Sequence, residues 1–172
     1  MRNFKRNVYS QFGEDGIIEE IFRRLNITNG KACEFGAADG YWLSNTRKLI
    51  DEGWTSVQLE ANRGQFVTEY NVNELVPQEL DFLSIDIDGN DYACWKAYIG
   101  KCKVVCIEIN SSKDPDIDSF TPEDGSNYSI MLKLAKQKGY ELLVHTGNMI
   151  FIERKYKKLF LDADLTFDTS WR

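Results

Sequence analysis

CEFGAADGYWLSN, residues 33–45, carries an apolar run directly into a turn built from small residues. With the two residues before it, this run predicts a short strand over residues 31–35. Glycines at positions 36 and 40 leave the backbone of the turn open to close approach, and Glu34 puts a carboxylate at its mouth. A strand that leads into a glycine turn is how many α/β proteins bind a nucleotide-like ligand.

Strands and helices alternate along the rest of the chain. We expect strands over residues 54–60, 80–88 and 102–110, and helices over 13–25, 46–52, 91–99 and 129–138. Segments 140–145 and 149–153 flank Thr146-Gly147-Asn148, which is a hairpin signal. This order predicts one α/β domain with a mainly parallel sheet and a closing antiparallel strand.

Composition excludes some classes of function. The chain has 172 residues, is 42% hydrophobic and carries a net charge of −6, which argues against a nucleic-acid partner because such proteins present a basic face. No apolar run is long enough to span a membrane, and none follows the basic N-terminus as in a signal peptide. We therefore expect a cytoplasmic protein without a membrane partner, whose four cysteines are buried thiols.

Polar residues gather at the predicted carboxyl ends of the strands, where such sheets bind ligands. The second strand ends at Glu60, the third at Asp86 and Asp88, and the fourth at Glu108 and Asn110. Like charges at one rim gain little stability, so this pattern indicates a site.

The glycine turn separates two cofactor classes. A dinucleotide fingerprint, G-x-G-x-x-G, fails because its second and third positions are Ala38 and Tyr41. The pattern E-x-G-x-x-x-G, seen in S-adenosylmethionine binders, fits as Glu34, Gly36 and Gly40. Glu34 would attract the amino end of that cofactor, and Glu60 would accept its ribose hydroxyls.

Five segments make a resemblance specific: SQFGED (10–15), CEFGAADGYWLSNT (33–46), LEAN (59–62), FLSIDIDGNDY (82–92) and CIEIN (106–110). Their order resembles that of the FkbM-type methyltransferases, which are class I S-adenosylmethionine-dependent enzymes, over residues 9–153. The resemblance implies a single methyltransferase-like domain with an N-terminal helical segment (1–30), a seven-stranded Rossmann-like core (31–153) and a C-terminal tail (154–172). It implies S-adenosyl-L-methionine as cofactor and O-methylation of a hydroxyl on a sugar, glycan or small molecule. The cofactor-binding residues it implies are Glu34, Gly36, Ala37, Ala38, Gly40, Asn45, Glu60, Ala61 and Asp86.

One segment departs from the family pattern. Residues 61–81 are too few for the helix, strand and second helix that a class I enzyme places there, which need about 30 residues. We expect a fold shortened around the third strand. The alternative function is a reduced, non-catalytic methyltransferase-like binding module.

Four polar residues are the predicted catalytic set: Asp86, Asp88, Glu108 and Asn110. A carboxylate among them would take the proton of an acceptor hydroxyl. Alternatively, Asp86, Glu108 and Asn110 would hold Mg²⁺, which lowers the pKa of that hydroxyl. The acidic loop 111–125 favours a neutral, hydroxyl-rich acceptor, and the aromatic tail 160–172 packs on the body or on a second subunit, which leaves a homodimer open.

Overall fold

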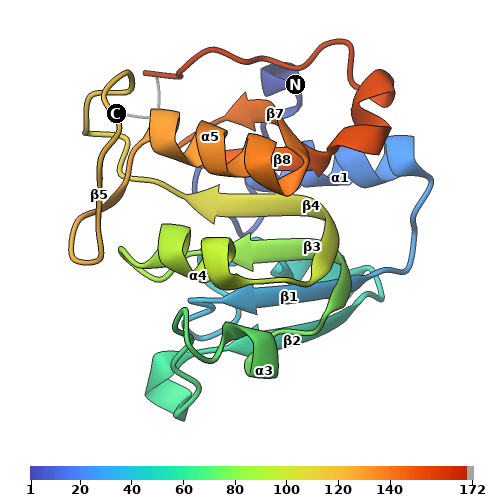
Figure 1. Cartoon of the computed structure of the whole chain (residues 1–172). Helices are drawn as coiled ribbons and strands as arrows, with labels where there is room; N and C mark the ends of the chain where they lie inside the picture. The colour runs from blue at the N-terminus through green and yellow to red at the C-terminus, as the bar shows by residue number, and fades with distance from the viewer. Residues whose placement is uncertain (170–172) are drawn as a thin grey trace.

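The computed structural model describes residues 1–169 and shows an α/β fold built on one main sheet (Figure 1). Its strands are β1 (Lys31–Phe35), β2 (Thr55–Leu59), β3 (Glu79–Ile85), β4 (Lys101–Glu108), β7 (Tyr140–His145) and β8 (Asn148–Glu153). They lie in the order β2-β1-β3-β4-β8-β7. β1 to β4 pair in parallel, and β8 runs antiparallel to both of its neighbours. The predicted mainly parallel sheet with a C-terminal antiparallel strand is confirmed.

Helices cover both faces of this sheet. α1 (Glu14–Leu25) and α2 (Arg47–Asp51) pack on one face. α4 (Asp91–Ala97), α5 (Tyr128–Lys138) and the single turn α3 (Val72–Leu75) pack on the other. Neighbouring residues of β3 serve opposite faces, since Phe82 joins the α1 side and Leu83 the α4 side. Both are fully buried, as expected for a strand in the middle of a covered sheet.

The third strand of a class I sheet is missing from the described residues. Between β2 and β3 the chain forms only the 3₁₀ turn η2 (Ala61–Arg63) and α3. The main sheet therefore has six strands and not the seven that the family resemblance implies. β2 becomes an edge strand, and Val57 on it is 37% exposed. The expected shortening around the third strand is confirmed.

Two strands end earlier than predicted. β3 stops at Ile85 because the Asp91 carboxylate accepts the backbone N–H groups of Ile87 (2.8 Å) and Gly89 (3.0 Å), which closes a turn. Asp88 lies in that turn with a φ of 58°. The N-terminal cap of α4 is Asn90, and Asp91 is the first residue of the helix.

β4 likewise stops at Glu108, since the chain beyond it turns toward a small two-stranded sheet. The backbone N–H of Asn110 donates to the carbonyl of Ser126 (2.7 Å). Ser126 belongs to β6 (Gly125–Ser126), which pairs with β5 (Phe120–Thr121). Loop 111–125 is thereby folded back over the end of β4.

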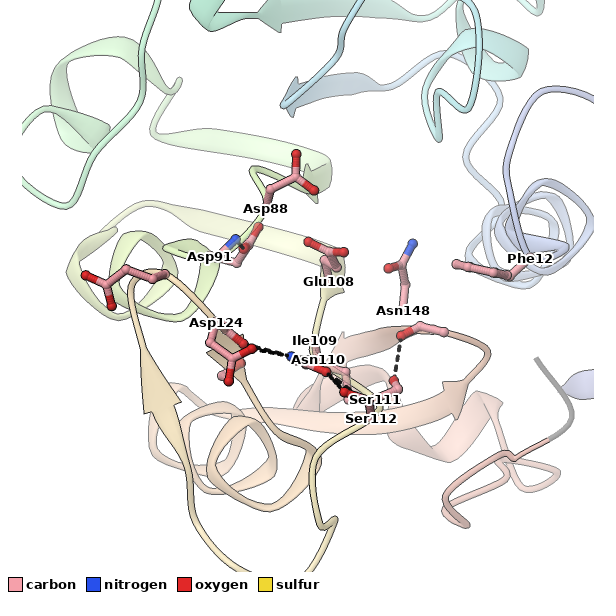
Figure 2. Close-up of a pocket in the computed structure, with 15 residues that line it drawn as sticks. Phe12, Asp88, Asp91, Glu108, Ile109, Asn110, Ser111, Ser112, Asp124 and Asn148 are labelled. Atoms are coloured by element: carbon pink, nitrogen blue, oxygen red, sulfur yellow. Dashed lines mark hydrogen bonds between the residues drawn. The ribbon is translucent and has the colours of Figure 1, made fainter. Parts of the chain in front are cut away.

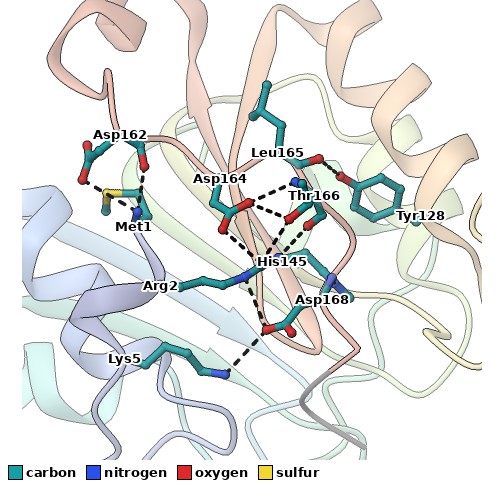
Figure 3. Close-up of polar contacts among 10 residues, drawn as sticks. All are labelled: Met1, Arg2, Lys5, Tyr128, His145, Asp162, Asp164, Leu165, Thr166 and Asp168. Carbon is teal, nitrogen blue, oxygen red and sulfur yellow. Dashed lines mark hydrogen bonds and ion pairs between the residues drawn. The ribbon is translucent and has the colours of Figure 1, made fainter.

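The N-terminal residues form polar contacts with the C-terminal segment 162–168 (Figure 3). The N-terminal ammonium donates to the carbonyl of Asp162 (2.8 Å), and the Arg2 guanidinium pairs with Asp164 (3.0 Å). The tail after η3 (Arg154–Leu159) packs on the body, where the Phe167 ring stacks on His145 at 4.6 Å between centroids. Trp171 lies outside the described residues.

Two further expectations concern the cysteines and the lack of a membrane-spanning segment. The four cysteines are buried and free, as predicted, and the pKa of the Cys33 thiol is raised to about 12 by burial. None of the helices among residues 1–169 is long and apolar enough to cross a membrane.

Candidate functional site

The turn after β1 requires glycine at position 36. Gly36 has a φ of 81°, and a Cβ there would lie 1.3 Å from the backbone carbonyl oxygen of Asp86. Its N–H donates to the carbonyl of Leu59 at the end of β2 (3.2 Å). The turn therefore passes between the carboxyl ends of β2 and β3 with no space for a side chain.

Buried Glu34 supports this turn through hydrogen bonds to the segment that follows it. The side chain is 3% exposed, and its carboxylate accepts the Ser44 hydroxyl (2.6 Å), the Thr46 hydroxyl (2.6 Å) and the Asn45 backbone N–H (2.7 Å). Three donors on one buried carboxylate are enough to satisfy its charge. Glu34 thereby fixes the path of the chain from the glycine turn into α2.

A cleft of about 290 Å³, the β1–β2 cleft, opens in front of the glycine turn. It lies at the lower end of the size range of ligand pockets. Five of the nine residues predicted to bind a cofactor line it: Gly36, Ala38, Glu60, Ala61 and Asp86. The other four, Glu34, Ala37, Gly40 and Asn45, are buried and are not among its lining residues. Binding by any of the nine stays a prediction.

Glu60 joins the two walls of the β1–β2 cleft. One carboxylate oxygen accepts the Ala38 backbone N–H (2.5 Å), and the other caps η2 by accepting the Ala61 N–H (2.8 Å). Each oxygen retains a second lone pair for a ligand hydroxyl. Ala38 itself has a φ of 46°, which the hydrogen bond that its N–H donates to Glu60 helps to maintain.

Phe66 is a lining residue that sequence reasoning missed. It comes from the shortened segment 61–81, lines the β1–β2 cleft and is 64% exposed. A large exposed aromatic ring beside a cleft is a common feature of binding sites. Its only signal in the sequence was an aromatic residue a few positions after the acid that ends β2.

Three carboxylates meet at the inner end of the β1–β2 cleft. Oxygens of Asp86, Asp88 and Glu108 lie within 4.8 Å of one another, and this acidic cluster has a geometry that could hold a metal ion. Burial raises the pKa of Asp86 strongly, with the Glu108 charge as the next cause. Burial also raises the pKa of Glu108, to a smaller extent. These two carboxyl groups therefore bind a proton more readily than free carboxyl groups do.

Asn110 forms hydrogen bonds with loop 111–125. Its amide donates to the Asp124 carboxylate (2.9 Å) and carbonyl (3.0 Å), and its side-chain oxygen accepts the Ser112 N–H (3.0 Å). The three carboxylates that lie together are Asp86, Asp88 and Glu108, and the set of Asp86, Glu108 and Asn110 as Mg²⁺ ligands stays a prediction. The prediction assumed that β4 continued to residue 110, whereas the chain turns at Ile109 toward loop 111–125.

A second pocket, the β4–β8 pocket, lies on the other side of the acidic cluster (Figure 2). Its volume is about 320 Å³. Asp88 lines both this pocket and the β1–β2 cleft, and Glu108 and Asn110 line this one as well. Phe12 and Asn148 form the wall beside the hairpin. The two cavities therefore share one boundary, made of carboxylates.

The SQFGED block positions Phe12 in that wall. Buried Glu14 accepts the Phe12 N–H (2.7 Å) and the Thr146 hydroxyl (2.7 Å), which ties α1 to the hairpin. Asp15 accepts three consecutive N–H groups of residues 8–10, each at 2.8 Å. Gln11, which belongs to the same block, lines neither cavity.

Comparison with known proteins supports the fold. No protein-family model matches the chain, and no curated protein matches it. Among solved structures, it is similar to the N-terminal domain of EvdMO1 in the presence of SAH and D-fucose, with a TM-score of 0.50, 12% identity and 82% of each chain covered. The glycopeptide N-methyltransferase MtfA is matched at a TM-score of 0.35 and 10% identity, over 84% of this chain and 90% of that one, which carries no argument. The first likeness agrees with the Rossmann-like sheet described above, and membership of the FkbM family stays a prediction.

Proposed function

We propose that the chain is an S-adenosylmethionine-dependent methyltransferase that acts on a hydroxyl group of a small-molecule or glycan acceptor. The observation that carries the proposal is the pair of cavities that meet at the acidic cluster of Asp86, Asp88 and Glu108. Group transfer requires two ligands to meet at one point. The structurally similar EvdMO1 domain was crystallised in the presence of SAH and D-fucose, a pair of ligands that matches one nucleoside cavity and one sugar-sized cavity.

The β1–β2 cleft fits the cofactor by the chemistry of its walls. Gly36 and Ala38 would present backbone to it, Glu60 would accept ribose hydroxyls, and Phe66 would cover an apolar part of the ligand. Glu34 and Asn45 would act from behind, by fixing the glycine turn. When bound, S-adenosylmethionine supplies an electrophilic methyl group on a sulfonium.

The acidic cluster would prepare the acceptor. An attacking hydroxyl has to be aligned and must lose its proton as it reacts. In the proposed arrangement Asp86 is the protonated member of the buried pair, in which burial raises both pKa values. Glu108 therefore accepts the acceptor's proton, Asp86 donates a hydrogen bond to Glu108, and Asp88, at the boundary of the two cavities, orients the hydroxyl.

Magnesium stays an alternative prediction for the same carboxylates. Asp86, Asp88 and Glu108 offer oxygen ligands of the kind that Mg²⁺ prefers. The comparisons give no support for it, and the proton transfer proposed above does not require it. Turnover measured with and without a chelator separates the two, since only a metal-assisted reaction would stop.

The experiment that tests the proposal measures methyl transfer directly. The protein is incubated with methyl-labelled S-adenosylmethionine and a panel of monosaccharides, and both labelled product and S-adenosylhomocysteine are quantified. We expect release that depends on the acceptor and that falls at least about 100-fold in Glu108→Gln. Glu79→Gln is the matched control, because Glu79 is exposed at the opposite end of β3. Acceptor-independent release, or equal turnover in the two variants, would contradict the proposal.

A second candidate function is the non-catalytic binding module. The missing third strand and the small β1–β2 cleft favour it, because both reduce the surface available to a cofactor. The retained acidic cluster argues against it, since three close carboxylates destabilise the fold and have no use in an inactive protein. Tight association with another protein, without any cofactor binding, would support this second function. The oligomeric state stays a prediction.

A further inference from the structure

We propose that the acceptor bound in the β4–β8 pocket is a hydroxylated amine, such as an amino sugar, whose protonated amino group is held by the carboxylates of that pocket. The inference deepens the proposed function and rests on it for the role of the pocket as the acceptor site. It differs from the neutral acceptor that the sequence led us to expect.

The charge of the lining is the first observation. Asp88, Glu108, Glu123 and Asp124 all line the β4–β8 pocket, and none of its fifteen lining residues is lysine, arginine or histidine. Two unit charges about 4 Å apart interact by about 4 kcal/mol near a protein surface. A neutral ligand would leave these carboxylates facing one another, a phosphate or carboxylate on the ligand would be repelled, and an ammonium group would be attracted.

A nearby lysine neutralises only part of this charge. Lys113 pairs with the Asp124 carboxylate (3.0 Å) and donates to the Gly125 carbonyl (2.7 Å), and its side chain is 13% exposed. Asp124 also accepts the Asn110 amide. Asp88 and Glu123 have no ion pair among those found for residues 1–169. These two carboxylates are therefore the ones with which an ammonium group of the ligand would form ion pairs.

The second observation is a buried hydroxyl in the lining of the pocket without a hydrogen-bond partner among the described residues. Ser126 lines the β4–β8 pocket and is 2% exposed, and its Oγ has no hydrogen-bond partner within residues 1–169. A buried polar group without a partner costs about 1–3 kcal/mol. A ligand hydroxyl would satisfy it, because a serine hydroxyl can both donate and accept.

The remaining lining fits a hydroxylated molecule and not a simple polyamine. Asn148 and Ser112 offer further amide and hydroxyl groups, and Phe12 presents an apolar ring (Figure 2). The volume of about 320 Å³ suits a ligand of roughly monosaccharide size. A ligand with an ammonium group for Asp88 and Glu123 and with hydroxyl groups for Ser126 and Asn148 would satisfy both the charged and the neutral polar side chains of the lining.

A matched set of probes tests the proposal. Binding of glucosamine, N-acetylglucosamine, glucose and spermidine is measured by calorimetry just below neutral pH, with chelator present and with and without S-adenosylhomocysteine. We expect glucosamine to bind at least about 10-fold more tightly than glucose and N-acetylglucosamine, which lack its charge. The preference should shrink as salt is added, because surface charges are screened. Equal binding of glucosamine and glucose, or tighter binding of spermidine, would overturn the inference.

Variants that remove a carboxylate charge show which residues cause the preference for glucosamine. Glu123→Gln should reduce the preference for glucosamine and leave glucose binding within about 2-fold. Asp88→Asn should reduce the preference as well, whereas Glu79→Gln should leave the binding of both sugars unchanged. Asn tolerates the positive φ of residue 88, so that variant keeps the turn. A preference that survives in the double variant overturns the inference.

The measurements with S-adenosylhomocysteine distinguish a failure of this inference from a failure of the proposed function. Binding of S-adenosylhomocysteine without any preference for glucosamine would overturn only the inference. A preference for glucosamine without binding of S-adenosylhomocysteine would overturn only the proposed function.

Discussion

Replacing Glu60 by alanine tests how the β1–β2 cleft would hold a nucleoside. The variant loses two bonds seen in the structure, from the backbone N–H groups of Ala38 (2.5 Å) and Ala61 (2.8 Å). The second of these is the cap of η2, which is worth about 1 kcal/mol. Because both groups lie near the surface, we expect the free energy of unfolding to fall by about 1–2 kcal/mol. In a chain of this length that lowers Tm by roughly 2–8 °C.

The effect on ligand binding should be larger. If ribose hydroxyls donate to the Glu60 carboxylate, removing a charged acceptor costs about 1.5–3 kcal/mol of binding free energy. This equals an increase in Kd for S-adenosylhomocysteine of about 10- to 150-fold. Glu60→Gln keeps one acceptor oxygen and should lie between the wild type and the alanine variant. The assay is calorimetric titration of each folded variant.

Asp39→Ala is the matched control for this prediction. Asp39 accepts the backbone N–H groups of Tyr41 and Trp42 (both 2.8 Å), so its loss also removes two bonds from the glycine turn. It does not line the β1–β2 cleft. An unchanged Kd in Glu60→Ala, or an equal loss in Asp39→Ala, would refute the role assigned to Glu60.

Three further predictions address the turn, the acidic cluster and the only histidine. Gly36→Ala should lower the free energy of unfolding, measured in urea, by more than about 2 kcal/mol. Gly64→Ala is the control and should cost about 1 kcal/mol, because Gly64 has a φ of 76° and no atom lies within 4 Å of the added Cβ. Equal costs in the two variants would contradict the close approach of Gly36 to Asp86. Asp86→Asn should reduce turnover less than Glu108→Gln, because an amide resembles a protonated carboxyl; the reverse order would make Asp86 the base. Burial lowers the pKa of His145 from 6.5 to about 4, so its contribution to stability is complete above pH 6.5 and is lost as pH falls toward 4, by up to about 3 kcal/mol. Chemical denaturation across that range should show that the free energy of unfolding changes with pH in the wild type, and that this dependence is reduced in His145→Phe. The same dependence on pH in both proteins would contradict the prediction.

The geometry at His145 explains why only its neutral form fits. Nδ1 accepts the backbone N–H of Asp168 (2.9 Å), and Nε2 lies 2.9 Å from the Ser111 hydroxyl. A second proton on Nδ1 would face the N–H of Asp168. His145 is the last residue of β7 and is fully buried.

Local patterns predicted most of the fold. β1 has the predicted bounds, and the hairpin of β7 and β8 differs from expectation only by the inclusion of Asn148. These segments are short, apolar and bounded by glycine or polar residues, so their hydrophobic pattern alone determines them. The shortened third-strand region was also predictable, because the length of a segment limits the elements it can form.

The candidate site was predicted less well, because its geometry depends on side-chain bonds across the chain. Asp86 and Asp88 meet Glu108 through a turn that Asp91 closes, and not by alternation along a strand. Asn110 bonds Asp124, a partner in a loop with no regular pattern. A sequence pattern shows that these polar residues follow strands, and it does not show which partner each side chain takes.

The central claim is that the β1–β2 cleft binds an S-adenosylmethionine-type ligand. Calorimetric titration of the folded wild-type protein with S-adenosylhomocysteine tests it most directly. We predict saturable binding of one molecule per chain, weakened by Glu60→Ala and unaffected by chelator. No heat of binding at millimolar ligand, with the protein shown to be folded by circular dichroism, would contradict the account.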